Sequence, residues 1–194
     1  GTKHAIGVAN GLDALILILR AYKELGKLKE GDEIIVPANT YIASILAITE
    51  NRLKPILVEP HESTYNLDPN LIERSITPKT KAIVPVHLFG LAADMDAIMA
   101  LAEKHNLYVI EDNAQAIGAN YTHKDGTKTK AGAIGHVAST SFFPSKNLGC
   151  YGDGGAIFTN DDDLAHTIRG IVNHGMYERY RHDVVGVNSR LDSI

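Results

Sequence analysis

The chain has 194 residues, of which 44% are hydrophobic and 22% are charged, and its formal net charge is −4 at pH 7. This composition is typical of a globular protein and excludes a mainly disordered chain. The weakly acidic balance gives no general attraction for a nucleic-acid backbone, so we expect no nucleic-acid partner. The most apolar run, from Leu12 to Leu19, is shorter than the roughly 20 residues that span a bilayer, so we expect no membrane partner.

The single cysteine and the chain ends carry further expectations. Cys150 alone allows no internal disulfide and no cysteine zinc site, and no basic and then apolar leader opens the chain. We therefore expect a reducing cytoplasm. The last residues, 190–194, stop in the middle of a pattern, which indicates a fragment. No linker or repeat divides residues 1–194, so we treat them as one domain.

Runs rich in Ile and Val predict buried strands, and they alternate with helical patterns. Asn10 is the expected cap at the start of the first helix, and Gly26 at its end. In chain order the pattern predicts helix 12–25, strand 33–36, helix 41–50, strand 55–59, helix 69–75, strand 81–86, helix 95–105, strands 107–111, 136–142 and 155–159, and a helix that opens at 161–163. This alternation predicts an α/β fold with right-handed crossovers and a mainly parallel sheet.

A glycine turn precedes the first helical pattern, in Ala9-Asn10-Gly11-Leu12-Asp13. The first N–H groups of a helix have no partner within it and can bind an anion. A capped helix start without a ligand is the alternative interpretation. The nucleotide fingerprints G-x-G-x-x-G and G-x-x-x-x-G-K-[ST] do not occur, nor does the G-x-S-x-G elbow. Their absence argues against dinucleotide binding, NTP hydrolysis and elbow-type esterase chemistry.

A carboxylate follows the strand predicted over 107–111. Chemistry in an open α/β sheet collects at the carboxyl ends of the strands, and Asp112 lies at that point. A buried carboxylate is costly unless it is hydrogen-bonded or paired with a cation. Asp112 therefore has either a structural hydrogen-bonding role or a bound positive group as its partner, and both interpretations stay open.

A lysine lies in the loop between the last two predicted strands, among aromatic and polar residues. Most lysines are solvated surface charges. Together, however, an anion-binding turn, an acid after a strand and this lysine are what pyridoxal phosphate (PLP) requires. Lys146 would form a Schiff base with the aldehyde, and Asp112 would keep the ring nitrogen protonated. Ser141 and the N–H groups near Gly11 to Asp13 would bind the phosphate.

At these positions the sequence resembles the PLP-dependent nucleotide-sugar aminotransferases, which have the fold of aspartate aminotransferase. The likeness covers essentially all 194 residues and depends on five motifs in the family's order. They are V-A-N-G-L-D-A-L at 8–15, V-P-A-N-T-Y at 36–41, E-D-N-A-Q-A at 111–116, S-F-F-P-S-K-N at 141–147 and G-D-G-G at 152–155. The resemblance implies a mainly parallel seven-stranded-type sheet in a three-layer α/β/α arrangement. Residues 1–194 would be the PLP-binding large domain, without the small C-terminal domain.

The resemblance also implies a role for each matched residue. Lys146 carries the cofactor and shuttles a proton, and Asp112 pairs with the pyridinium nitrogen. Gln115 hydrogen-bonds the ring oxygen, and Tyr41 stacks on the ring face. The phosphate site would consist of Ser141, the backbone of Gly11, Leu12 and Asp13, and Asn188 from the opposite subunit. Many members have threonine where this chain has Leu12, so only the N–H contact would remain there.

The implied reaction moves an amino group from glutamate to a keto sugar linked to a nucleoside diphosphate, as in amino-sugar and cell-surface polysaccharide biosynthesis. The runs 20–29 and 40–44 resemble members that act on 3-keto-6-deoxy sugars linked to dTDP. Family members work as homodimers with shared active sites, so we expect a second copy of the chain as a partner.

Two alternatives keep this fold. Dehydratase relatives replace the lysine with histidine, and Lys146 argues against that reaction. A non-catalytic or regulatory module is the other alternative, and the missing small domain favours it. We expect no metal site, because His174 and His182 are too far apart for a pair on one helix face and no acid cluster lies near them. His87 follows a predicted strand, and we interpret it as a hydrogen-bonded structural histidine.

Overall fold

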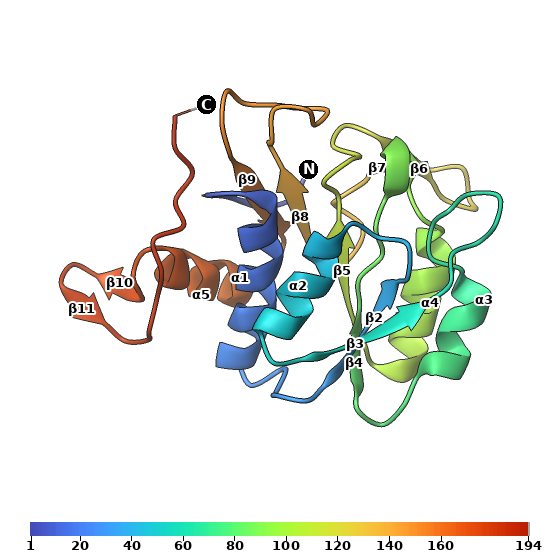
Figure 1. Cartoon of the computed structure of the whole chain (residues 1–194), viewed down its shortest axis with the longest axis horizontal. Helices are drawn as coiled ribbons and strands as arrows, with labels where there is room; N and C mark the ends of the chain where they lie inside the picture. Colours follow the sequence, from blue (N-terminus) through green and yellow to red (C-terminus); the bar gives the residue numbers. More distant parts are fainter. Residues whose placement is uncertain (194) are drawn as a thin grey trace.

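A seven-stranded sheet with helices on both faces forms the centre of the computed structural model, which describes residues 1–193 (Figure 1). Its strands are β1 (His4–Val8), β2 (Glu33–Pro37), β3 (Lys54–Val58), β4 (Thr80–Ile83), β5 (Tyr108–Asp112), β8 (Val137–Ser141) and β9 (Gly155–Thr159), in the order β1-β9-β8-β5-β4-β2-β3. The pairs from β8 through β3 are parallel, and β9 is antiparallel to β8 and β1. The predicted α/β fold with a mainly parallel sheet is confirmed.

Five α-helices accompany the sheet within the described residues. They are α1 (Gly11–Glu24), α2 (Ile42–Glu50), α3 (Pro69–Ile72), α4 (Met95–His105) and α5 (Asp162–Val172), with short 3-10 turns η1 (Glu73–Ser75) and η2 (Leu88–Gly90). Both predicted caps of α1 are confirmed: Asn10 Oδ1 accepts the Asp13 N–H at 2.8 Å, and Gly26 follows the helix end at φ 69°. In this part of the chain, none of the helices is long and apolar enough to cross a membrane.

The alternation of strand side chains divides the interior into two cores. Successive strand residues point to opposite faces, so Ile34 and Val36 of β2 pack in the core that α1 and α5 cover. Ile35 packs on the other face, in the core that α3 and α4 cover. The result is the three-layer α/β/α arrangement that the family resemblance implies. The carboxyl ends of the parallel strands meet at one edge of this sandwich.

Two small hairpins were not predicted. One joins β6 (Asn120–Thr122) to β7 (Lys128–Lys130), and the other joins β10 (Met176–Glu178) to β11 (Arg181–His182). The second hairpin projects from the body beside α5 (Figure 1). It is anchored by Tyr177, whose ring stacks on His166 of α5 with centroids 4.7 Å apart. A Cβ at Gly170 would collide with the Tyr177 ring, so the absence of a side chain there lets the hairpin dock.

Candidate functional site

Two adjacent strands bring predicted site residues to one edge of the sheet. β5 and β8 pair in parallel with Asp112 opposite Ser139, so Asp112 and Ser141 lie at neighbouring strand ends. The loop over 142–154 lies at the same end of the molecule as the starts of α1 and α2 (Figure 1). This edge is where an open α/β sheet binds its ligands.

The carboxylate of Asp112 is buried and oriented by two donors. Asp112 is only 5% exposed. Oδ2 accepts the Ser44 hydroxyl at 2.8 Å, and Oδ1 accepts the Ala114 N–H at 3.2 Å. Both contacts are hydrogen bonds to the carboxylate, so the structural role considered for Asp112 is present, and a cationic ligand group remains compatible with it.

Ser44 is a residue of this site that the sequence analysis did not single out. Its N–H donates to the Tyr41 carbonyl at 3.2 Å, and its hydroxyl also lies 2.9 Å from Thr40 Oγ1. The start of α2, where Tyr41 is the N-cap residue, is thereby tied to Asp112. A small polar residue three positions after Tyr41 in an otherwise apolar helix is the signal that could have indicated it.

The start of α1 lies against the end of β8. A Cβ added to Gly11 would lie 2.6 Å from Ser141 Cβ and 3.1 Å from its Oγ, so only glycine permits this approach. This packing brings the Ser141 hydroxyl beside the first N–H groups of the helix, and such a group of donors suits a phosphate. The Asp13 N–H already donates to Asn10 Oδ1. The N–H groups of Gly11 and Leu12 are therefore the better candidates to donate to a phosphate.

Gln115 follows Asp112 by three residues and is half-buried. Its Oε1 accepts the N–H of Phe89 at 2.8 Å. A backbone N–H can only meet the oxygen end of an amide, so this contact leaves the amide N–H₂ group as the free end. Tyr41 is 71% exposed at the start of α2, which leaves its ring face accessible.

Lys146 lies in the loop after β8 and is half-buried. Its backbone N–H donates to the Phe143 carbonyl at 2.8 Å, in a turn that Gly149 allows because a Cβ there would collide with the Pro144 carbonyl. The chemical role of Lys146 stays a prediction.

Asn188 is exposed on the segment that returns from the β10–β11 hairpin. The next residue, Ser189, is 1% exposed; its hydroxyl donates to Asp13 Oδ2 at 2.6 Å and accepts the Ala9 N–H at 3.3 Å. The segment is therefore anchored to the glycine turn of its own chain. The assignment of Asn188 to the opposite subunit stays a prediction.

His87 and Glu111 form a fully buried pair behind the site. His87 Nε2 lies 2.8 Å from Glu111 Oε2, and neither residue is exposed. Burial by itself would raise the pKa of Glu111, but hydrogen bonds from His87 and from the N–H groups of Gly135 and Gly132 hold this pKa below its ordinary 4.5. The interpretation of His87 as a hydrogen-bonded histidine is confirmed.

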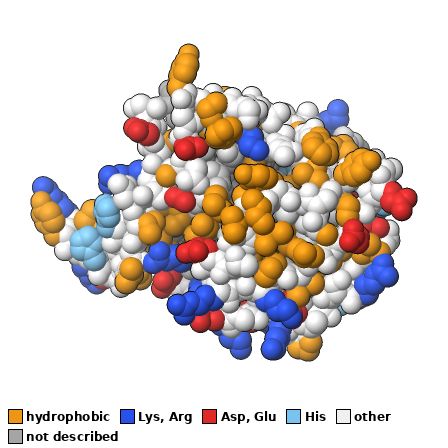
Figure 2. All heavy atoms as spheres, viewed as in Figure 1, with side chains coloured by type: hydrophobic (Ala, Val, Ile, Leu, Met, Phe, Trp, Pro, Cys, Tyr) orange, Lys and Arg blue, Asp and Glu red, His pale blue; other side chains and the backbone are white. Residues whose placement is uncertain are grey.

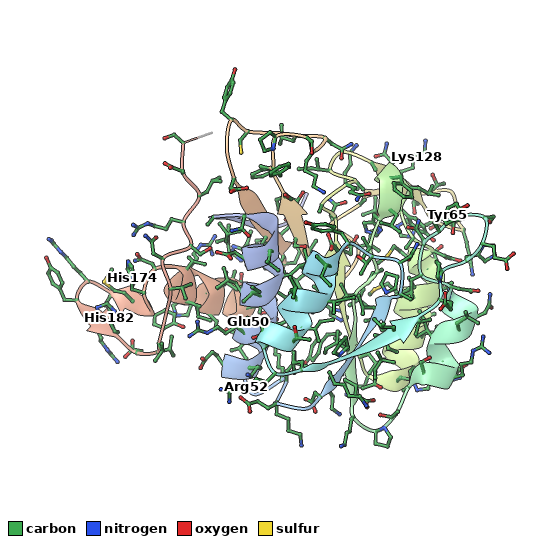
Figure 3. The ribbon with its side chains drawn as sticks, viewed as in Figure 1. Glu50, Arg52, Tyr65, Lys128, His174 and His182 are labelled. Carbon is green, nitrogen blue, oxygen red and sulfur yellow. The ribbon has the colours of Figure 1, made fainter. Side chains whose placement is uncertain are left out.

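His174, His182 and the cavity beside α4 lie apart from the site at the sheet edge. Figure 3 shows His174 and His182 on the projecting hairpin, where His182 Nδ1 donates to the His174 carbonyl at 2.9 Å. Among residues 1–193, no three His, Cys, Asp or Glu side chains gather as a metal-binding group. A cavity of about 760 Å³ lies between α4 and the turn that follows β6, lined by residues that include Asn106 and His136. These residues precede β5 and β8, so the cavity lies away from the carboxyl edge of the sheet.

Comparison with known proteins agrees with this arrangement. The DegT/DnrJ/EryC1/StrS aminotransferase family matches residues 1–194. The chain is 55% identical over 194 residues to a dTDP-3-amino-3,6-dideoxy-alpha-D-galactopyranose transaminase of Aneurinibacillus thermoaerophilus. The matched region is 100% of this chain and 51% of that protein. The chain is 53% identical over 194 residues to a UDP-2-acetamido-2-deoxy-3-oxo-D-glucuronate aminotransferase of Pseudomonas aeruginosa, with 100% and 52% coverage.

A solved structure of a related protein is also similar to this chain. The X-ray structure of S. venezuelae DesV in complex with a ketimine intermediate matches with a TM-score of 0.89 and 51% identity, over 98% of this chain and 49% of that one. The chain thus spans about half the length of the relatives it matches.

Proposed function

Because this chain belongs to the DegT/DnrJ/EryC1/StrS aminotransferase family, we propose that it is the PLP-binding large domain of an enzyme that transfers an amino group from glutamate to a nucleotide-linked keto sugar. One observation carries the proposal. The start of α1 packs against Ser141 at the end of β8, which brings a hydroxyl beside the first N–H groups of a helix, and a buried, oriented carboxylate ends the neighbouring strand. These are the two anchor points of PLP, one for its phosphate and one for its ring nitrogen.

The chemistry of the cofactor defines what the chain's residues must do. When bound, PLP supplies an aldehyde that accepts an amine and a protonated ring that withdraws electrons. Asp112 holds the proton at the ring nitrogen, while Ser44 and the Ala114 N–H keep its carboxylate in place. Lys146 Nζ would hold the aldehyde carbon until the donor's amine displaces it, and the freed lysine amine would then move a proton from the donor's α-carbon. Lys146 also favours amino transfer over the dehydratase alternative.

The phosphate is bound at the junction of α1 and β8. The Ser141 hydroxyl and the N–H groups of Gly11 and Leu12 donate to it, and the positive end of the α1 dipole adds attraction. Leu12 contributes no hydroxyl, and its side chain packs on the core beneath α1 instead. Asn188 of a second copy would complete the phosphate site.

We propose a 3-keto sugar as the amino acceptor. The names of both relatives specify position 3, as 3-amino in one and 3-oxo in the other. They differ in the nucleotide, dTDP in one and UDP in the other. A dTDP-linked 3-keto-6-deoxyhexose is the acceptor we propose, because the relative with 55% identity is named for a dTDP-linked 3-amino-3,6-dideoxy sugar.

A second copy of the chain is the partner we propose. Hydrophobic side chains gather on the surface around α2 (Figure 2). Tyr41, Ile42 and Leu46 are 71%, 50% and 44% exposed there, next to the Asp112 edge. An exposed apolar patch of this kind indicates an interface, and this one would place two sites close together. The cytoplasm is the compartment we propose, since the single cysteine, Cys150, is a free thiol.

The test is to trap the cofactor on the chain. We expect PLP to give a visible absorbance band with the 194-residue protein, and borohydride to fix the cofactor on the peptide that contains Lys146. Lys146→Ala should abolish the band and the adduct, while Lys128→Ala, on β7, should retain both. An adduct spread over surface lysines, or one that survives in Lys146→Ala, would contradict the proposal. Amino transfer from glutamate to a dTDP-linked 3-keto sugar is then measured with the full-length enzyme.

A further inference from the structure

The acid in the first turn of α1 is bonded to a segment near the end of the described chain. Asn10 is the cap residue of this helix, and Asp13 follows it by three positions. An acid at this position commonly folds back and accepts backbone N–H groups at the start of its own helix. In this structure Asp13 Oδ2 instead accepts the hydroxyl of Ser189 at 2.6 Å, although the two residues are 176 positions apart in the sequence. A distant residue therefore decides where this carboxylate lies.

The Asp13 carboxylate lies on the side of α1 opposite to Ser141. Successive helix residues are rotated by about 100°, so Asp13 points about 200° away from Gly11, which packs on Ser141 at the end of β8. Ser189 also accepts the N–H of Ala9, directly after β1, at 3.3 Å. Because β9 lies between β1 and β8 in the sheet, the carboxylate is held beside one strand end and the Ser141 hydroxyl belongs to another. The acid is thus kept away from the donors that we propose for the phosphate.

The place of this acid matters for anion binding. The start of a helix carries a partial positive charge, and an acid in the first turn competes for it with an external anion. Without its distant partner, the short Asp13 side chain would accept an N–H group at the helix start, where Gly11 and Leu12 offer theirs to a phosphate. The carboxylate would then occupy a donor of the phosphate and also repel its charge.

The segment that carries Ser189 is held in place by contacts other than its hydroxyl. The Ser189 N–H donates to the Val172 carbonyl at 3.1 Å, and the Val187 N–H donates to the Ile171 carbonyl at 2.8 Å. The start of α1 has its own cap, because Asn10 Oδ1 accepts a backbone N–H of the first turn. Removal of the Ser189 hydroxyl therefore leaves both backbones in place and acts mainly on the carboxylate.

From these contacts we propose that Ser189 is a positioning residue of the phosphate site, whose hydroxyl holds the Asp13 carboxylate on the β1 side of α1 and keeps the helix start open for an anion. The inference rests on the proposed function, in which that anion is the phosphate of PLP. In this role Ser189 does not contact the phosphate. It acts by keeping a like charge away from it.

Pyridoxal, which lacks the phosphate, separates this role from a loss of stability. Ser189→Ala should lower PLP affinity about 3- to 10-fold and leave pyridoxal affinity near the wild-type value, both measured by absorbance titration. A purely structural defect would weaken both ligands equally. Thr159→Val is the matched control, because the Thr159 hydroxyl also donates one hydrogen bond, to the His136 carbonyl at 2.9 Å, and accepts a backbone N–H, that of Asp161 at 3.1 Å. Thr159 lies at the far end of β9, so this variant should lower stability without changing the ratio of the two affinities.

Asp13→Asn tests whether the effect comes from the acid. In the Ser189→Ala background, removal of the charge should restore the ratio of PLP to pyridoxal affinity to the wild-type value. With Ser189 intact, the acid is already held away, so the same substitution should change the ratio less. The difference between the two backgrounds measures the coupling of Ser189 to Asp13.

A second measurement needs no PLP. Inorganic phosphate, titrated into the protein and followed by NMR, should shift the amide resonances of Gly11 and Leu12 in the wild type. Ser189→Ala should need about 3- to 10-fold more phosphate for half of the shift. Ser189→Ala combined with Asp13→Asn should respond as the wild type does.

The outcomes distinguish this inference from the proposed function. A wild-type ratio of PLP to pyridoxal affinity in Ser189→Ala, an equal effect of Asp13→Asn in both backgrounds, or wild-type Gly11 and Leu12 amides that do not respond to phosphate would each overturn the role of Ser189. If Ser189→Ala does not fold, Ser189→Cys replaces it, since a thiol is similar in shape and a weaker donor. Failure of the wild type to bind PLP would contradict the proposed function, while the phosphate titration would still test Ser189.

Discussion

Ser44 donates its hydroxyl proton to Asp112 across 2.8 Å, from the first turn of α2 to the last residue of β5. The contact joins two elements that are far apart in the sequence. It makes the start of α2, with its exposed Tyr41, a fixed neighbour of the carboxylate. Tyr41 and Asp112 are the residues that we expect on the face and at the nitrogen of one aromatic ring, so this hydrogen bond determines how they are placed relative to each other.

Replacing Ser44 by alanine should therefore lower both stability and cofactor affinity. Ser44 is 2% exposed, and its loss leaves one oxygen of a buried carboxylate without that donor, at a cost of about 1–3 kcal/mol. Urea unfolding measures the first effect, and an absorbance titration with PLP measures the second. Thr49→Ala, at the exposed end of α2, is the control and should change stability by less than about 0.5 kcal/mol. Equal effects of the two substitutions would disprove the role of Ser44.

Gly11→Ala should weaken PLP binding more than it weakens folding. The new Cβ would lie 2.6 Å from Ser141 Cβ, so the α1 start has to move away from the Ser141 hydroxyl, and the proposed phosphate donors separate. We expect a stability loss of about 1–3 kcal/mol and a PLP affinity at least about 10-fold lower. Gly152→Ala is the control, because its Cβ would have no neighbour within 4 Å. Wild-type affinity in Gly11→Ala would refute the role of the Gly11–Ser141 junction in phosphate binding.

Glu111 should make the protein sensitive to acid. Its pKa is lower in the folded state than the ordinary 4.5, so the unfolded state binds the proton more tightly. The stabilisation is complete above about pH 4.5 and is lost as the pH falls through the lowered folded-state pKa. Glu111→Gln should cost about 3 kcal/mol at neutral pH and should flatten the fall in unfolding free energy below about pH 4.5.

An exposed carboxylate gives the comparison for this acid dependence. Glu73 pairs with Lys104 and His105 at the surface, and hydrogen bonds from both lower its pKa. The effect of Glu73→Gln should shrink in 1 M salt, because exposed pairs are screened. The effect of Glu111→Gln should persist in the same salt, since its partners are buried. If salt removed both effects, the buried network would not be the cause.

Gly170→Ala should release the β10–β11 hairpin from α5. The added Cβ would collide with the Tyr177 ring, which then loses its stacking on His166. We expect faster trypsin cleavage at Arg179 and Arg181, measured by mass spectrometry, with a loss of about 1–3 kcal/mol in stability. The matched control is Ala165→Gly on the same helix, which removes a methyl without touching Tyr177. Comparable cleavage in both variants would argue against a specific anchor.

Local signals in the sequence account for most of the fold. The predicted strands over 33–36, 81–86 and 107–111 match β2, β4 and β5 to within a few residues, because buried parallel strands are continuous apolar runs. The predicted helix over 69–75 is divided into α3 and η1, because its apolar face is too short to stabilise one longer helix. The β6–β7 and β10–β11 hairpins are short and polar, so no alternation of apolar residues could indicate them.

The site is predictable only as far as its motifs reach. Asp112 and Gly11 are found because a strand end and a glycine turn have recognisable patterns. Ser44 and His87 act through contacts with residues distant in the sequence, and only the fold brings these together. Glu111 is visible in the sequence only as part of a motif. Its four donors come from a loop and a histidine that the pattern does not connect to it.

The position of β1 at the edge of the sheet has a consequence for synthesis on the ribosome. In the sheet, β1 pairs with β9 alone, with His4 opposite Thr159, so it has no strand partner until the chain up to Thr159 has left the exit tunnel. Until then α1, whose inner face is apolar, also lacks the cover of α5. The nascent chain therefore exposes the apolar edge formed by β1 and α1 while the residues up to β9 and α5 are made, and a chaperone that recognises apolar helices would bind it there.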